Sequence, residues 1–177
     1  MRKNLGTKNT LYPMPLTVIG TVFENKNHFI LVGHVGIIDH KTVAISIHKS
    51  RYSQQGLRAN RAYSINLLTE DMVPAANKAA FMNGWKEDKS TLFETETGAV
   101  ANAPLIKNAP VSMGCEVIDI YERPEFDIFI AKIRESLVDE KYLGADGSID
   151  YEKMAPLLFA GQKHYYKMGQ KVTPGDE

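Results

Sequence analysis

Short runs of β-branched and aromatic residues recur along this chain, and polar turns separate them. Such runs are typical of β-strands, in which alternate side chains face opposite sides of a sheet. Strands and helices do not alternate regularly, so a parallel sheet is not indicated. The pattern predicts a mainly β fold with inserted helices, arranged as a closed or nearly closed antiparallel β-barrel. The predicted strands cover residues 16–23, 28–32, 42–48, 63–68, 111–120 and 126–133.

The predicted strand at 42–48 has two faces of different character. Its branched apolar residues share one face, which suits a core. The opposite face carries Thr42, Ala44, Ser46 and His48, which are small or polar. Because alternate residues of a strand share a face, this second face is expected to lie against a bound ligand or water.

Three segments are predicted to be helical, at 54–60, 70–82 and near 151–159. Thr69 is positioned to cap the second of them, and Pro74 suits its first turn, where the missing N–H costs nothing. All three predicted helices are short, so they are expected to be insertions between the strands of the barrel.

The run Ser46-Ile47-His48-Lys49-Ser50-Arg51-Tyr52-Ser53 joins the end of the third predicted strand to the first predicted helix. It combines hydroxyls, an imidazole and two permanent cations, which are the groups that bind a phosphate. Ser53 is expected to cap a helix beginning near Gln54, whose free N–H groups would add to the attraction. The alternative is a basic, solvated strand end.

Composition narrows the classes of function. The chain has 177 residues with a formal net charge of +0, 44% hydrophobic and 24% charged residues, and one cysteine, Cys115. These values predict one soluble domain without a basic face for nucleic acid and without a membrane-spanning run. A lone cysteine cannot form an internal disulfide, and residues 1–6 lead into no apolar signal segment. The expected location is the cytoplasm.

Motifs for several enzyme classes are missing from the sequence. It contains no Gly-x-Gly-x-x-Gly, no phosphate-binding P-loop and no Gly-x-Ser-x-Gly. The five histidines lack the spacing of a metal site, and no paired carboxylates stand out. We therefore assign no catalytic residue and no metal ligand.

The polar segment 85–97 is expected to leave the barrel as an excursion. Trp85 opens it in a polar setting that offers a large ring little burial within one subunit, so a partner subunit is expected to hold it. Leu92 and Phe93 are expected to anchor the segment.

Six short motifs, in this order, resemble those of flavin reductase-like proteins, the FMN-binding split-barrel family, and most closely its flavoredoxin branch. The likeness runs from about Tyr12 to about Gly169. It implies a six-stranded antiparallel split β-barrel, with residues 1–177 forming a single flavin reductase-like FMN-binding domain. It also implies a homodimer with one FMN per subunit near the interface. The motifs are 12–16, 35–37, 49–53, 64–66, 88–90 with Phe93, and 103–106.

The resemblance also implies which residues hold FMN. The backbone of His34, Val35, Gly36 and Ile37 would lie along the isoalloxazine ring, and Ser46, Ile47 and His48 beside the ribityl chain. Lys49, Tyr52 and Ser53 would hold the phosphate, while Asn83, Gly84, Lys89 and Ser90 match a Ser-Gly pair and a Lys-Ser motif.

Some positions depart from the family pattern. Leu31 and His34 stand where the family often has Thr and Trp. Asn83 replaces Ser, and Trp85 replaces a small or basic residue.

The resemblance leaves three functions open. The first is an NAD(P)H-dependent flavin reductase, in which the flavin supplies the chemistry and the protein needs no acid, base or nucleophile. The second is a flavoredoxin-type electron-transfer protein with little NAD(P)H turnover and a redox protein as partner. The third is a split-barrel binding module that has lost flavin.

Overall fold

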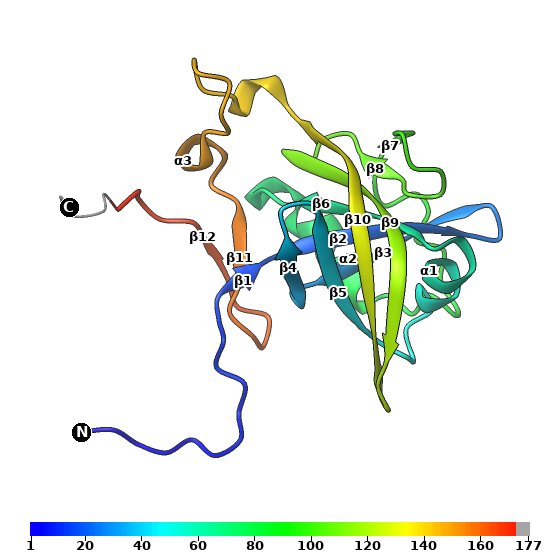
Figure 1. The fold of residues 1–177 in the computed structure, drawn as a ribbon, viewed down its shortest axis with the longest axis horizontal. Coiled ribbons are helices and arrows are strands. Elements are labelled where there is room, and N and C mark those ends of the chain that lie inside the picture. Colours follow the sequence, from blue (N-terminus) through cyan, green and yellow to red (C-terminus); the bar gives the residue numbers. More distant parts are fainter. Residues whose placement is uncertain (173–177) are drawn as a thin grey trace.

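A computed structural model describes residues 1–172 and confirms a mainly β fold. One antiparallel sheet contains seven strands in the order β3-β2-β6-β9-β10-β5-β4 (Figure 1). The strands are β2 (Thr17–Phe23), β3 (Lys26–Val32), β4 (Val35–Asp39), β5 (Thr42–His48), β6 (Ala62–Leu67), β9 (Val111–Glu122) and β10 (Phe126–Val138).

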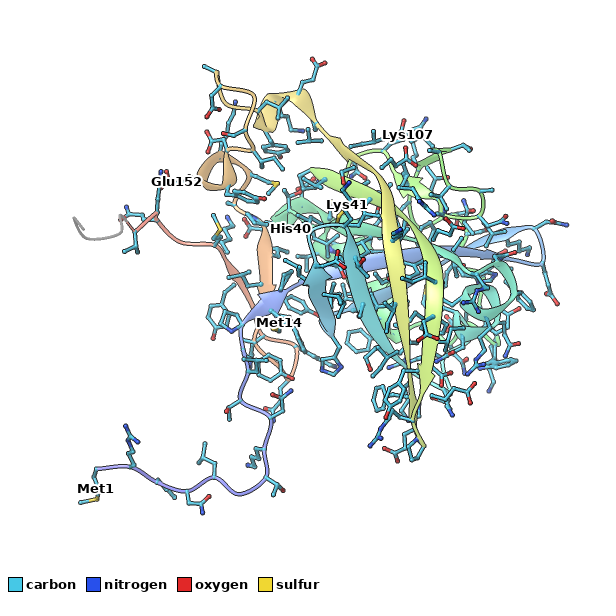
Figure 2. All side chains as sticks on the ribbon, in the orientation of Figure 1. Met1, Met14, His40, Lys41, Lys107 and Glu152 are labelled. Atoms are coloured by element: carbon cyan, nitrogen blue, oxygen red, sulfur yellow. The ribbon has the colours of Figure 1, made fainter. Side chains whose placement is uncertain are left out.

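The sheet has one strand more than the six that were predicted, because β4 was not recognised. β4 pairs only with β5 among the described residues and lies at an edge of the sheet. Its residues from Ile37 to Asp39 are all exposed, so the strand lacks the alternation that marks a half-buried strand. Figure 2 shows His40 and Lys41 at the turn that joins β4 to β5.

The sheet curls around one core. Ile30 and Val32 of β3 share this core with Val43, Ile45 and Ile47 of β5, although four strands separate β3 from β5 in the sheet order. Only a sheet closed on itself brings these side chains together. Among the described residues, no strand pairing joins β3 to β4, so the barrel stays open along that seam.

A second apolar cluster lies on the other face of β2 and β3, under a helix. The predicted helix at 70–82 is a 3₁₀ turn, Glu70–Met72, followed by α2, Val73–Phe81, with Pro74 in its first turn as expected. Met72 and Ala76 pack in this cluster. Thr69 donates its hydroxyl to the Asp71 carboxylate and makes no backbone cap. This packing places α2 against β3, and the C-terminal end of α2 lies beside the seam of the barrel.

The excursion after α2 is anchored as predicted. Phe93 is buried against Phe29 with ring centroids 5.0 Å apart, and Leu92 packs on the same cluster. The short strands β7 (Thr95–Glu96) and β8 (Leu105–Ile106) pair farther along this segment.

Helix α1, Gln54–Asn60, forms where it was predicted. It lies close to β2, and a Cβ on Gly56 would stand 2.5 Å from the carbonyl oxygen of Val22. Only glycine permits this approach. Ser53 precedes the helix with αR backbone angles, and its side chain makes no cap hydrogen bond, which corrects the predicted capping role.

The predicted helix at 151–159 was wrong over most of its length. Residues 151–159 form the short helix α3, Tyr151–Met154, and then the strand β11, Leu157–Phe159. Ala155 is left-handed, with φ of 44°, and Pro156 follows, so the helix cannot continue. β11 pairs with β1 (Met14–Pro15) and β12 (Tyr165–Lys167) in a small sheet near both chain ends (Figure 1). A second 3₁₀ turn, Glu140–Tyr142, follows β10.

Asn66 joins β6 to its surroundings through buried hydrogen bonds. Its amide nitrogen donates to the Val18 carbonyl at 3.0 Å, and its side-chain oxygen accepts from Ile106 N at 2.9 Å and from Ser112 Oγ at 2.7 Å. This satisfies the polar groups where three segments meet and accounts for the Ser64-Ile65-Asn66 motif. None of the helices in residues 1–172 has the length and apolar character needed to cross a membrane.

Candidate functional site

A cavity of about 1050 Å³, here called the large cavity, opens beside the seam of the barrel. Ser46 and His48 line it, so the C-terminal half of the polar face of β5 faces a cavity, whereas Thr42 of the same face is buried away from it. Ile47, from the opposite face of the strand, also contributes to the lining. Phe81 at the end of α2 and Phe126 at the start of β10 add aromatic surface. Within residues 1–172 its lining contains no carboxylate.

A second cavity of about 330 Å³, here called the small pocket, adjoins the large cavity. Two segments form most of it, the loop 50–53 after β5 and the loop 82–85 after α2, and Lys89 completes it. Ile30, Ser50, Arg51 and Phe81 line both spaces, so the two cavities adjoin. Together they form a candidate site with a large part and a smaller, polar part.

The small pocket carries the groups that an anion requires. The Ser53 hydroxyl is buried and has no hydrogen-bond partner in the part of the chain that the structure describes. Lys89 is 7% exposed, and its Nζ donates to the Ala79 carbonyl at 2.6 Å. Burial, and then the positive charge of Arg51, lower the pKa of Lys89. Within residues 1–172, a buried hydroxyl without a partner lies beside two cations in a pocket whose lining has no carboxylate, and these groups fit a phosphate.

The loop after α2 is held in place on the small pocket. Asn83 accepts from Trp85 N at 3.0 Å through its side-chain oxygen, and its own N–H donates to Glu87 Oε2 at 2.6 Å. A Cβ on Gly84 would lie 2.9 Å from Tyr52 Cβ, so glycine lets the two loops touch.

His48 is fixed at the junction of strand and loop. Its Nδ1 accepts from Ser50 N at 3.1 Å and contacts Ser50 Oγ at 2.8 Å, while its ring lies 5.0 Å from that of Phe126. Because Nδ1 accepts from an amide, Nε2 carries the ring proton and is the donor. The contacts of Nδ1 thus fix the orientation of a ring that lines the large cavity.

The structure brings most of the sequence-predicted site residues together. Those in the large cavity are His34, Ser46, Ile47 and His48, and those in the small pocket are Tyr52, Ser53, Asn83, Gly84 and Lys89. Leu31, one of the departures from the family pattern, also lines the large cavity.

The other predicted residues lie elsewhere. Val35 and Gly36 line a third cavity of about 260 Å³. His34 and Ser46 line both this cavity and the large cavity. Ile37 is 85% exposed and lines none of the three cavities. Lys49 and Ser90 also lie outside these linings. The Lys49 ammonium stands 3.5 Å from Asp127 Oδ1.

Sequence reasoning missed several lining residues. Arg51 was one of the two cations in the basic run but received no role, although it lines both spaces. Phe81, Phe126 and Phe159 come from three distant segments and converge only in the folded chain. No local pattern marks them, whereas the charge of Arg51 beside Ser53 was a usable signal.

Comparisons with known proteins agree with this architecture. The family model described as flavin reductase like domain matches residues 9–168. A flavoredoxin from Methanosarcina acetivorans is 28% identical, with a TM-score of 0.93 over 99% of this chain and 95% of that one. Flavoredoxin of Desulfovibrio vulgaris (Miyazaki F) is 27% identical, with a TM-score of 0.90 over 99% and 97%.

More distant likenesses extend the comparison. An FMN-binding protein from Thermus thermophilus is 18% identical and shares the fold, with a TM-score of 0.84 over 98% of this chain and 100% of that one. An uncharacterized protein of Aeropyrum pernix is 25% identical over 126 residues, which is 68% of this chain. The match spans less than half, 46%, of the length of that relative.

Proposed function

Because this chain belongs to the flavin reductase-like domain family, we propose that it is an FMN-binding flavoprotein that acts as an NAD(P)H-dependent flavin reductase or oxidoreductase. One observation carries the proposal. Among residues 1–172 the buried Ser53 hydroxyl has no hydrogen-bond partner; it shares a pocket with Lys89 and Arg51, and that pocket adjoins a larger, aromatic-lined cavity. A narrow anion pocket joined to a wide apolar space is the shape of a phosphate joined to a planar ring system.

The roles of the residues follow from their chemistry. Ser53, Lys89 and Arg51 would hold the phosphate, whose charge their donors match. Ser46 and His48 would meet the ribityl chain with polar groups. Phe81 and other apolar side chains of the large cavity would exclude water from the ring system.

When bound, FMN supplies the hydride and electron chemistry, so the protein needs no acid, base or nucleophile of its own. The chain's own contribution is to bind and orient. His48 lines the large cavity, and its ring, fixed by the contact of Nδ1 with Ser50 N, would offer the Nε2 proton to the bound flavin.

Titration of the apoprotein with FMN and with riboflavin tests the proposal. Riboflavin lacks the phosphate, and the loss of charge-assisted hydrogen bonds should weaken its binding at least about tenfold. Flavin fluorescence measures both dissociation constants. Equal affinities for the two flavins would contradict the assignment of the small pocket to the phosphate. If neither flavin bound, the proposed function itself would be wrong. Mixing the FMN-loaded protein with NADH or NADPH under anaerobic conditions then tests the donor, because reduction bleaches the visible absorbance of the flavin.

A second candidate is a flavoredoxin-type electron carrier with little NAD(P)H turnover and a redox protein as partner. The likeness to two flavoredoxins, at 28% and 27% identity over nearly the whole chain, favours it. The same anaerobic experiment separates the two. A carrier would keep its flavin oxidised with both pyridine nucleotides and become reduced only by a reduced redox protein.

We also infer that the chain forms a homodimer. The edge strand β4 exposes Ile37 and Ile38, and Ile118 on β9 is exposed as well. Exposed apolar residues on an unpaired strand edge favour association. Light scattering should give twice the chain mass, and Ile37→Lys should shift the protein towards the monomer. A monomeric parent protein would contradict the inference.

A further inference from the structure

Trp85, the single tryptophan of the chain, stands at the rim of the small pocket with 60% of its surface exposed. Its indole N–H donates to the Ser50 carbonyl at 3.3 Å, and its ring centroid lies 4.8 Å from that of Tyr52 at an interplanar angle of 72°. Both contacts tie the indole to the loop that forms the other wall of the pocket. The ring is therefore positioned, although it is not buried.

Trp85 is supported by its own loop and by a series of aromatic contacts. Asn83 holds the Trp85 backbone, and Gly84 allows close contact with Tyr52. Tyr52 rests in turn on His28, with ring centroids 4.9 Å apart, and on Phe23, at 5.8 Å. A chain of aromatic rings thus runs from strands β2 and β3 to an exposed indole. Such a preorganised ring loses little conformational freedom when a planar group stacks on it.

The charges beside the indole favour an anion. The small pocket contains Arg51 and Lys89, and among its lining residues within 1–172 there is no carboxylate. Nearby acidic groups lie outside this lining and have protein partners, and one of them, Glu87, also acts on Lys89 and raises its pKa. Glu87 accepts from Asn83 N, and Asp88 pairs with Lys26 at 2.7 Å. A cationic pocket with an exposed aromatic ring at its rim has the two elements that recognise a nucleotide, a phosphate site and a stacking surface.

We propose that Trp85, supported by Tyr52, is a stacking platform for the adenine of FAD, with the pyrophosphate in the small pocket. The site then takes FAD as well as FMN. This proposal rests on the proposed function, because it assumes that the flavin ring occupies the large cavity. It adds a specificity-determining residue that contacts only the part of the ligand beyond the first phosphate.

Flavin titrations of three variants test the platform. Trp85→Ala should raise the dissociation constant for FAD about tenfold, the range of one base–aromatic stacking contact, and raise that for FMN by clearly less. Trp85→Phe keeps an aromatic surface and should retain part of the FAD affinity. Tyr121→Ala removes an exposed ring outside both cavities and should change neither constant.

The fluorescence of the single tryptophan gives an independent readout. ADP, which has the adenine and two phosphates but no flavin, should quench Trp85 fluorescence in the apoprotein, whereas inorganic pyrophosphate should not. The inference is overturned if Trp85→Ala alters FAD and FMN binding equally, or if ADP leaves the fluorescence unchanged. Failure of both flavins to bind would instead refute the proposed function, and the ADP titration would still decide the adenine platform.

Discussion

Arg58 of helix α1 holds the buried carboxylate of Asp127 on strand β10. The Arg58 guanidinium donates from Nε at 3.1 Å and from Nη2 at 2.6 Å to the same oxygen, Oδ2. Asp127 is 1% exposed, and its other oxygen lies 3.5 Å from the Lys49 ammonium. This carboxylate therefore connects α1 and the loop after β5, which lead into the small pocket, to the barrel wall.

Replacing Arg58 should destabilise the fold. Arg58→Met would leave Asp127 buried with only the more distant Lys49, and loss of one partner of a buried charge costs about 3 kcal/mol. Urea unfolding would measure the fall in the free energy of unfolding. Glu122→Gln is the matched control, because its pair with Arg58 is exposed and should be worth less than about 1 kcal/mol. Equal effects of the two substitutions would contradict the importance of Asp127.

Ser53→Ala should separate ligand binding from stability. The hydroxyl has no hydrogen-bond partner within residues 1–172, so its removal should leave the free energy of unfolding of the apoprotein unchanged or higher. The same change removes a donor to the proposed phosphate and should weaken FMN binding about tenfold. Calorimetric titration measures the affinity. Ser90→Ala, outside the pocket, should bind FMN normally, and unchanged affinity in Ser53→Ala would exclude a role for the hydroxyl.

Replacing Lys89 should weaken FMN binding more than replacing Lys49. Lys89 lines the small pocket, whereas Lys49 lies beside Asp127 outside both cavities. Lys89→Met should therefore raise the dissociation constant for FMN more than Lys49→Met does, while riboflavin affinity stays nearly equal in the two variants. If Lys49→Met weakens FMN binding as strongly as Lys89→Met does, Lys49 contacts the phosphate, as the family resemblance implies.

His28 should make stability depend on pH. Burial lowers the pKa of His28 below its ordinary value of 6.5, although its ring bonds the Phe23 carbonyl at 3.2 Å. Between the folded and unfolded pKa values the unfolded chain binds more protons, so stability is complete above pH 6.5 and falls as the pH drops below it.

Thermal unfolding between about pH 8 and about pH 5 checks this expectation. His28→Gln should flatten the decline in midpoint temperature, whereas the variant at the exposed His40, His40→Gln, should keep it. A decline of the same size in His28→Gln would assign the pH dependence to other groups.

The strands could be predicted because their signal is local. In β5 and β10, alternate residues enter the core, and that alternation is visible in the sequence. β4 escaped detection because an edge strand that faces solvent has no such alternation. The segment 151–159 misled prediction for a related reason, since its apolar residues suit a short helix and then a strand that pairs with β1.

The narrow end of the site was also largely visible in the sequence. Ser53, Tyr52 and Lys89 were assigned from charge, hydroxyls and family resemblance, and they line one pocket. The wide end was less accessible, because Phe81 and Phe126 are separated by many residues and carry no distinguishing neighbours.

By itself, the sequence determined the periodic features of this protein: the six long strands whose alternation or apolar run is local, the polar face of β5 and the cluster of cations after it. The destination of each side chain was decided only by the tertiary structure. Lys49 and Arg51 carry the same charge two residues apart, yet Lys49 lies beside Asp127 of β10 and Arg51 lines both cavities. The physical reason is that the partner of a charged side chain depends on which segments the fold brings together. The pairing of β5 with β10 places Asp127 opposite Ile47, two residues before Lys49, and so within reach of the Lys49 ammonium.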